Sequence, residues 1–232
     1  MKLSLVIPCF NEAANIPLLL ERCKVLTLRS DIEVILVDNG STDDSARVLE
    51  SLLPSYPGCR SVRVEKNQGY GYGILQGLHS ARGEILAWTH ADMQTDPCDV
   101  LRGLALFELH GENIFVKGSR YGRPFADVAF TVGMSIFETV LLRTPLWDIN
   151  AQPNMFHRSF LASWQQPPYD FSLDLFAFYT AKIRSMPVHR FPVNFGERAH
   201  GVSHWNINWA AKMKFIKRTV TFSLQLNKSR KP

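Results

Sequence analysis

The chain has 232 residues, of which 46% are hydrophobic, 11% aromatic and 20% charged; this allows one sizeable core and excludes the fibrous and disordered classes. Its four cysteines form no CxxC pair, which excludes a zinc ribbon and favours a reducing compartment over a disulfide framework. The net charge of +5 is uneven, because no acidic residue follows Glu197 while eight Lys and Arg residues do. Such a basic end indicates an anionic surface, ligand or membrane as a partner.

Strand and helix patterns alternate along the first half of the chain. Short apolar runs predict strands, and apolar residues at i, i+3, i+4 and i+7 predict helices. Four such alternations predict an α/β fold with a mostly parallel central sheet and helices on both faces. The expected strands are Leu3–Ile7, Ile32–Val37, Ser61–Val64, Ile85–Thr89 and Ile114–Lys117, and the expected helices begin near Asn15, cross Leu49–Leu53, and cover Tyr72–Arg82 and Asp99–His110.

Polar residues follow four of the predicted strands, at 11–12, 38–41, 67–69 and 90–94. Ligands of parallel sheets sit beyond the carboxyl ends of the strands, so we expect these turns to form a pocket, although each turn alone would also suit a helix cap. No GxGxxG follows the first strand, and no GxxxxGK[ST] occurs anywhere. A diphosphate ligand would therefore be neutralised by other means, of which a metal ion is the most direct.

Five motifs occur in order: residues 6–12 (VIPCFNE), 37–43 (VDNGSTD), 67–69 (NQG), 91–94 (ADMQ) and 118–120 (GSR). Together they resemble the family 2 glycosyltransferases of GT-A fold, nearest to the polyprenyl-phosphate (dolichol-phosphate) mannosyltransferase-like branch, over about residues 1–205. The resemblance implies an inverting transfer of a sugar from a nucleotide-diphosphate sugar to a polyprenyl-phosphate or cell-envelope glycan acceptor. It also implies Mn²⁺ or Mg²⁺ as cofactor, and a cytoplasmic protein that is peripheral on the inner face of the membrane.

The resemblance also assigns roles to individual residues. Catalytic roles fall on Asp92, Arg120, Arg198 and Asp174, and metal binding on Asp92, Gln94 and His90. Nucleotide-sugar contacts fall on Pro8, Phe10, Glu12, Asp38, Asn39, Asn67, His90 and Ala91. The acceptor side is expected at Asp148, Gln152, His200 and Ser203.

Two of these assignments leave alternatives open. His90 stands where the family usually has Asp: it would ligate a borderline metal such as Mn²⁺, or hydrogen-bond the sugar or phosphate while Asp92 and Gln94 hold the ion, or mark a catalytically silent nucleotide-sugar-binding protein. Asp174 would serve as a general base only for a hydroxyl acceptor, because a lipid phosphate is already an anion. Alternatively, Asp174 would be a charged residue on a helix with no role in the reaction.

The basic end predicts a second unit, residues 206–232, after a transferase domain of residues 1–205. Apolar residues at helical spacing predict an amphipathic helix from Asn208 to about Leu226 that lies on an anionic membrane or packs on the body. Val128–Leu142 would be a second interfacial helix or core. Because the longest apolar run, at 128–137, is far shorter than the about 20 residues of a bilayer span, we expect neither an integral membrane protein nor a signal peptide. A nucleic-acid partner is not expected, because the basic and aromatic residues gather on one short helix.

Overall fold

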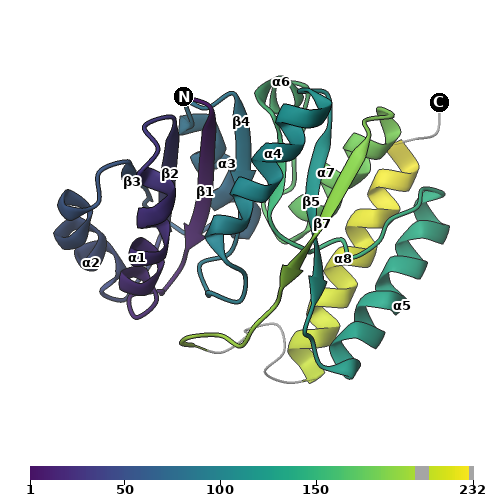
Figure 1. Ribbon diagram of the computed structural model, residues 1–232. Helices are drawn as coiled ribbons and strands as arrows, with labels where there is room; N and C mark the ends of the chain where they lie inside the picture. The colour runs from purple at the N-terminus through teal and green to yellow at the C-terminus, as the bar shows by residue number, and fades with distance from the viewer. Residues whose placement is uncertain (202–208, 230–232) are drawn as a thin grey trace.

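A seven-stranded mixed sheet forms the centre of the computed structural model, which describes residues 1–201 and 209–229 (Figure 1). The strand order is β3-β2-β1-β4-β6-β5-β7. All neighbouring strands are parallel except β6, which runs antiparallel to both β4 and β5. The strands are β1 (Leu3–Cys9), β2 (Ile32–Asn39), β3 (Cys59–Val64), β4 (Ile85–Trp88), β5 (Phe115–Tyr121), β6 (Asn154–His157) and β7 (Val188–Asn194).

Helices cover both faces of this sheet. One apolar core lies between the sheet and α1, α2 and α4, and a second lies between the opposite face and α3, α6 and α7. The helices are α1 (Ile16–Thr27), α2 (Ser45–Leu52), α3 (Tyr70–Ser80), α4 (Val100–His110), α5 (Phe125–Leu142), α6 (Arg158–Ala162), α7 (Ser172–Ile183) and α8 (Trp209–Ser229), with short 3₁₀ helices at Leu53–Ser55 and Pro97–Asp99.

The predicted fold class is confirmed, and each expected strand and helix is present with ends shifted by a few residues. The sequence analysis did not foresee β6, β7 or α7. Strand β6 has only four residues, which is too short for a clear alternation. Strand β7 contains Pro192 and alternates weakly; it occupies the edge of the sheet, where a proline removes no ladder hydrogen bond.

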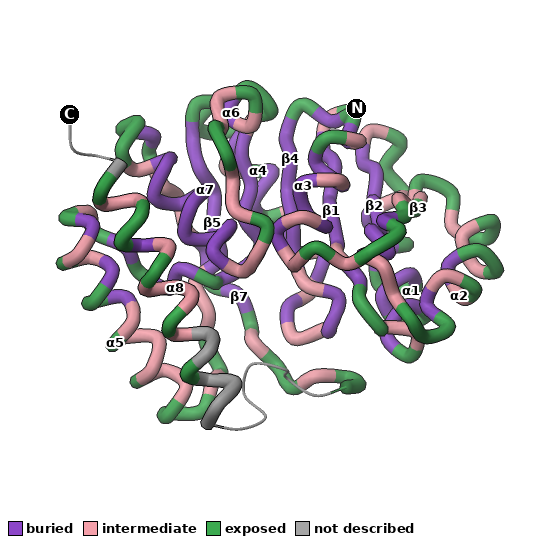
Figure 2. The backbone as a smooth tube through the Cα atoms, turned by 180° about the vertical axis from the view of Figure 1, so that it is seen from behind, coloured by how far each residue is buried: buried purple, intermediate pink, exposed green. Residues whose placement is uncertain are grey.

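Helices α5 and α8 form a pair at one end of the molecule, where both views place them side by side (Figures 1 and 2). On α5 only Ser135, Glu138 and Leu142 are buried, and Ser223 Oγ of α8 donates to Glu138 Oε1 at 2.8 Å. Exposed apolar residues follow one face of α5: Phe125, Ala129, Ile136 and Val140. Among the described helices, α5 alone is long and apolar enough to span a membrane, by length and composition.

The C-terminal helix is present. The body contacts Phe222, Ser223 and Leu226 of α8, whereas Met213 and Leu224, two of the apolar residues that recur at helical spacing in the sequence, are each almost half exposed. A polar residue therefore lies at the centre of the packed side. The boundary predicted between residues 205 and 206 lies outside the described residues.

Helix α3 approaches the sheet closely because it carries glycine where it crosses β1 and β2. A Cβ added to Gly77 would lie 2.3 Å from Val6 Cγ1 and 2.9 Å from Val37 Cγ2. Both valines are fully buried in the second core. Since neither can give way without disturbing its own packing, this glycine sets the distance between helix and sheet.

Gly77→Ala is expected to lower the free energy of unfolding by about 1–3 kcal/mol, because overpacking outweighs the gain in helix propensity. The matched control is Gly133→Ala on α5, where an added Cβ meets nothing within 4 Å. That variant is expected to be neutral or to gain up to about 1 kcal/mol. Urea unfolding followed by circular dichroism measures both, and equal stability of the two variants would contradict the close approach.

Candidate active site

The ends of β1, β2 and β4 and the turns that follow them meet at one edge of the sheet. Cys9 at the end of β1 pairs with Asp38 of β2. The turns after the two strands are tied together, since Asn11 N donates to Ser41 Oγ at 3.1 Å and Glu12 N donates to Ser45 Oγ at 2.9 Å. The predicted convergence of these turns is therefore present.

Two buried acceptors without partners mark the end of β2. Asp38 and Asn39 are each 2% exposed. One oxygen of Asp38 accepts from Ser41 N at 3.0 Å and the Asn39 amide donates to Gly69 O at 2.9 Å, yet Asp38 Oδ2 and Asn39 Oδ1 have no partner among the described residues. Buried acceptors without a donor are costly. Both suit N–H or O–H groups of a ligand such as a base or ribose.

The turn after β4 is held against the loop that follows β7. Asp92, buried at 5% exposure, forms an ion pair of 2.8 Å with Arg198. Gln94 contributes two more links, because its carbonyl accepts from Gly196 N at 2.8 Å and its side-chain Nε2 donates to Gly196 O at 3.1 Å. Arg198 thus lies beside the motif acid, and residues 195–201 cover this edge of the site.

Glu12 faces the same ion pair. Burial raises its pKa, and the charges of Asp92 and Asp43 raise it further, against the opposing effects of its hydrogen bond to Asn15 and of Arg198. These carboxylates lie close enough to repel one another, so the edge of the site favours a cation.

The donor set at this turn fits a hard divalent ion. Asp92 supplies a carboxylate, and the Gln94 amide nitrogen is committed to Gly196 O, which leaves its amide oxygen as a ligand. Oxygen ligands suit Mg²⁺ and Mn²⁺. Within residues 1–201 and 209–229, no group of three or more His, Cys, Asp or Glu residues could hold a metal ion. A site of one carboxylate and one amide would be completed by phosphate oxygens of a substrate, as is usual for Mg²⁺.

The remaining residues predicted for the nucleotide side occupy the surrounding loops. Asn67 Oδ1 accepts from Gly69 N at 2.8 Å, which shapes the turn before α3. Phe10 is exposed, whereas Ala91 is buried beside Asp92. Pro8 is partly buried in β1, and His90 is partly buried after β4, with Nδ1 3.4 Å from Tyr70 Oη.

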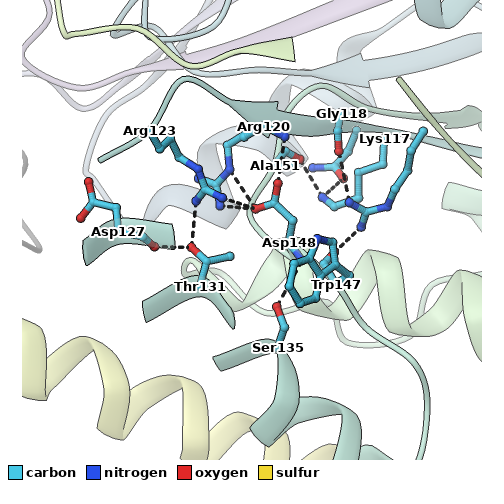
Figure 3. Close-up of polar contacts among 12 residues, drawn as sticks. Lys117, Gly118, Arg120, Arg123, Asp127, Thr131, Ser135, Trp147, Asp148 and Ala151 are labelled. Atoms are coloured by element: carbon cyan, nitrogen blue, oxygen red, sulfur yellow. Dashed lines mark hydrogen bonds and ion pairs between the residues drawn. The ribbon is translucent and has the colours of Figure 1, made fainter. Parts of the chain in front are cut away.

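A second polar cluster surrounds Asp148 at the end of β5 (Figure 3). The Asp148 carboxylate, 2% exposed, accepts from Arg120 N at 3.0 Å and from Arg120 Nε at 2.9 Å, and lies 3.8 Å from Arg123. Arg123 donates to Thr131 Oγ1 at 2.8 Å, while its buried Nε has no partner among the described residues. Two guanidinium groups therefore share one carboxylate, which leaves positive charge for an anionic ligand.

Sequence reasoning missed three members of this cluster: Arg123, Arg190 and Lys117. Arg190 donates to the carbonyls of Gly118 and Trp147. Lys117 is fully buried, which lowers its pKa to about 7. Two of them were local in sequence, because Lys117 directly precedes the GSR motif and Arg123 follows it by three residues. Arg190 is brought in by the pairing of β5 with β7.

Asp174 and Gln152 lie together in the core. Asp174, 1% exposed, accepts from Trp88 Nε1 at 3.0 Å, Gln152 Nε2 at 2.8 Å and Asn154 Nδ2 at 2.8 Å, all on the same oxygen. Such a carboxylate is held by the protein, which suits a structural role better than proton transfer. His200 is exposed near the nucleotide side, where its carbonyl accepts from Asn15, and Ser203 lies outside the described residues.

A small cavity of about 50 Å³ separates Arg120 from the α5–α8 pair. Its lining combines apolar side chains with Arg120 and other polar residues. Glu138 also lines it, and burial raises the pKa of this carboxyl to about 7, against the opposing effect of its hydrogen bond with Ser223. The lining includes Phe130, Met134, Ile149, Phe171 and Leu175.

Comparison with known proteins points to one family. The model of glycosyl transferase family 2 matches residues 4–141. Two undecaprenyl-phosphate 4-deoxy-4-formamido-L-arabinose transferases are similar: that of Yersinia enterocolitica is 35% identical over 113 residues, covering 46% of this chain and 34% of the relative, and that of Pseudomonas paraeruginosa is 38% identical over 120 residues, covering 50% and 34%. The chain thus spans about a third of the length of these relatives.

Solved structures show the same fold at low identity. Glucosyl-3-phosphoglycerate synthase from Mycobacterium tuberculosis, in complex with Mn²⁺, UDP-glucose and glycerol 3-phosphate, superposes with a TM-score of 0.70 at 21% identity, covering 97% of this chain and 79% of that one. Its complex with Mg²⁺ and UDP gives a TM-score of 0.68 at 20% identity with the same coverage. The GT-A fold expected from the sequence is confirmed.

Asp148→Asn is expected to lower the free energy of unfolding at neutral pH by roughly 3 kcal/mol, because two buried guanidinium groups lose their counter-charge. Burial alone would raise the pKa of Asp148, but the hydrogen bonds and charge of Arg120 lower it overall. The carboxylate therefore stabilises the fold fully at pH values above the ordinary Asp pKa of about 3.9. This contribution is lost as the pH falls through the lower pKa that Asp148 has in the folded state.

Urea unfolding at a series of pH values tests this expectation. The stability of the wild type should fall more steeply below about pH 4 than that of Asp148→Asn. The control, Asp44→Asn, breaks an exposed pair with Arg47 and should change stability little. Parallel pH profiles for wild type and Asp148→Asn would show that the ion pair does not stabilise the fold.

Proposed function

The chain belongs to glycosyl transferase family 2, and on that premise we propose that it transfers a sugar from a nucleotide-diphosphate sugar to a polyprenyl phosphate, with inversion at the anomeric carbon. The observation that carries the proposal is the arrangement of two opposed sites. Orphaned acceptors at Asp38 and Asn39 and the Asp92–Arg198 pair lie on one side, and the Arg120–Arg123 cluster lies on the other. The printed names of the relatives, undecaprenyl-phosphate sugar transferases, support this acceptor class.

The donor half of the site would bind the nucleotide and the diphosphate. Asp38 and Asn39 would accept hydrogen bonds from the base or ribose, with Phe10 and Pro8 beside them. Asp92 and Gln94 would hold a divalent cation, which when bound supplies a Lewis acid that offsets charge on the departing diphosphate. Arg198 would exchange Asp92 for phosphate oxygens and so stabilise the same developing charge.

The acceptor half of the site would bind a phosphate monoester. Arg120 and Arg123 share Asp148 and present excess positive charge at the end of β5. A phosphate anion needs no general base, and this agrees with Asp174 being enclosed by three donors. We therefore assign Asp174 to positioning, and assign Asp148 to orienting Arg120.

Membrane association forms part of the same proposal. The α5 face that carries Phe125, Ile136 and Val140 is exposed and apolar, and Met213 and Leu224 of α8 are almost half exposed. Lys217 of α8 is exposed as well. An apolar helix face next to basic residues is suited to an anionic bilayer surface, where a polyprenyl phosphate resides. We place the protein on the cytoplasmic face, as a peripheral protein.

Asp92→Asn is expected to reduce sugar transfer at least about 100-fold with the fold intact, because the variant loses charge where the cation and Arg198 meet. The assay supplies radiolabelled nucleotide sugars with undecaprenyl phosphate in detergent. EDTA should abolish transfer and Mn²⁺ or Mg²⁺ should restore it. The matched control is Asp31→Asn, an exposed carboxylate paired with Arg29 at the start of β2.

Three outcomes would count against this assignment. Turnover by purified Asp92→Asn would remove Asp92 from the reaction. Activity that survives EDTA would remove the metal. Donor binding by calorimetry without transfer or hydrolysis for any sugar would favour a catalytically silent nucleotide-sugar-binding protein of the same fold.

The double variant Ile136→Ser with Val140→Ser is expected to weaken binding to anionic vesicles, because each substitution removes apolar area from the proposed contact face. Full burial of one such side chain contributes about 1–3 kcal/mol, so the affinity for vesicles should fall about 10-fold or more. Sedimentation with phosphatidylglycerol vesicles measures it. Leu109→Ser on α4, 74% exposed and on another face, is the control. Equal loss in both variants, or no binding by wild type, would defeat the membrane proposal.

A further inference from the structure

A chain of hydrogen bonds links the core to His90, the unusual residue of the metal-site motif. Lys117 Nζ donates to Asn154 Oδ1 at 2.6 Å, and Asn154 Nδ2 donates to Gln152 Oε1 at 2.9 Å. Gln152 Nε2 lies 3.4 Å from Tyr70 Oη, which lies 3.4 Å from His90 Nδ1. Lys117, Asn154 and Gln152 are at most 1% exposed.

The direction of these hydrogen bonds is fixed from two ends. The Asp174 carboxylate can only accept, so the groups 2.8 Å from it are the NH₂ groups of Gln152 and Asn154. In this orientation the Asn154 oxygen faces Lys117 Nζ at 2.6 Å, and a lysine nitrogen carries hydrogens to donate to it in either protonation state. Both constraints give the same orientation of the two amides, so the network leaves no freedom to flip either one.

The orientation of the Gln152 amide determines the direction of the hydrogen bond between Tyr70 and His90. Because Gln152 presents an N–H to it, the Tyr70 oxygen accepts on that side, and its own proton is available for His90 Nδ1. Burial raises the pKa of Tyr70 well above its ordinary value, and the charges of Asp174 and Asp92 raise it further, against the opposing effect of a hydrogen bond from Trp88; the phenol therefore keeps this proton. Both contacts of the hydroxyl are long at 3.4 Å, as is common in sites before substrate binds.

The ring of Tyr70 is held in place independently of its hydroxyl. It stacks on Phe171 with ring centroids 4.5 Å apart and planes inclined by 10°. The ring of His90 lies 5.5 Å from it, tilted by 30°. The stacking of Tyr70 on Phe171 therefore holds the Tyr70 hydroxyl beside His90.

We infer that Tyr70 is a positioning residue that fixes the tautomer of His90, so that the imidazole accepts at Nδ1 and presents an N–H donor at Nε2. A nitrogen that carries a proton cannot ligate a metal ion. His90 thus donates a hydrogen bond to an oxygen of the nucleotide sugar, and Asp92 and Gln94 supply the protein ligands of the cation. The assignment of the ligand rests on the proposed function, whereas the tautomer does not.

Nitrogen NMR of metal-free protein labelled with ¹⁵N-histidine tests the tautomer directly. Long-range proton–nitrogen spectra at mildly alkaline pH distinguish protonated from bare ring nitrogens, and His90→Gln identifies the signals. We expect Nε2–H in the wild type and in Tyr72→Phe, a tyrosine on the same helix outside the network. Tyr70→Phe should shift His90 to a mixture of tautomers. Nδ1–H in the wild type, or no change in Tyr70→Phe, overturns the inference.

Binding of Mn²⁺, followed by electron paramagnetic resonance with and without UDP, tests the consequence for the metal. We expect His90→Phe, which has no metal-binding atom, to bind Mn²⁺ about as the wild type does. Asp92→Asn should lose roughly 10-fold or more in affinity. An equal loss in His90→Phe would make His90 a ligand and overturn the inference. Absence of Mn²⁺ binding by wild type would contradict the proposed function instead, and the NMR result would still decide the tautomer.

Discussion

The carboxylate of Asp174 is the fixed point around which the polar core is arranged. Burying a charge in an apolar core is costly unless hydrogen bonds compensate for it, and here three donors converge on one oxygen. These donors come from β4, β6 and the loop before β6, while the carboxylate itself is on α7. The network therefore joins β4, the strand before His90, to the loop that carries Asp148, and sets the two halves of the site relative to each other.

The two halves differ in the sign of their charge. Around Asp92, burial raises the pKa of Glu12 and the charges of Asp92 and Asp43 raise it further, so the cluster of carboxylates favours a cation. Around Asp148 the guanidinium groups of Arg120 and Arg123 outnumber their carboxylate, which favours an anion. The proposed reaction, between a metal-bound diphosphate and a phosphate nucleophile, would need this separation, because two anions would have to be brought together without repelling each other.

Much of the donor half could be predicted from sequence because its residues follow strands directly. The motif around Asp38 and the motif around Asp92 each lie within one turn, and parallel strands bring such turns together by rule. The direction of hydrogen bonds to His90 could not be predicted in this way. Tyr70 and Gln152 are 82 positions apart in the chain, and β6, which positions the latter, is a four-residue strand without a recognisable period.

The burial of individual side chains distinguishes between the alternative roles that the sequence left open for Asp174 and for α8. An acid at position 174 was expected near the acceptor, and only packing distinguishes a base that faces substrate from a carboxylate enclosed by Trp88 and two amides. Similarly, the stripe on α8 indicated an amphipathic helix without saying which side is covered. The side that packs contains Ser223, bonded to Glu138 of α5, so Met213 and Leu224 remain partly exposed.

The position of α5 connects the acceptor site to this exposed surface. Helix α5 begins at Phe125, only four residues after β5 ends at Tyr121, so Arg123 lies at the joint between strand and helix. The cavity beside Arg120 is lined by residues of α5, α7 and α8, so the arginine cluster and the helix pair share one boundary. Under the proposed function, the helix pair would contact the membrane and would also form one wall of the phosphate site. A lipid acceptor would then react while its hydrocarbon chain stays in the bilayer.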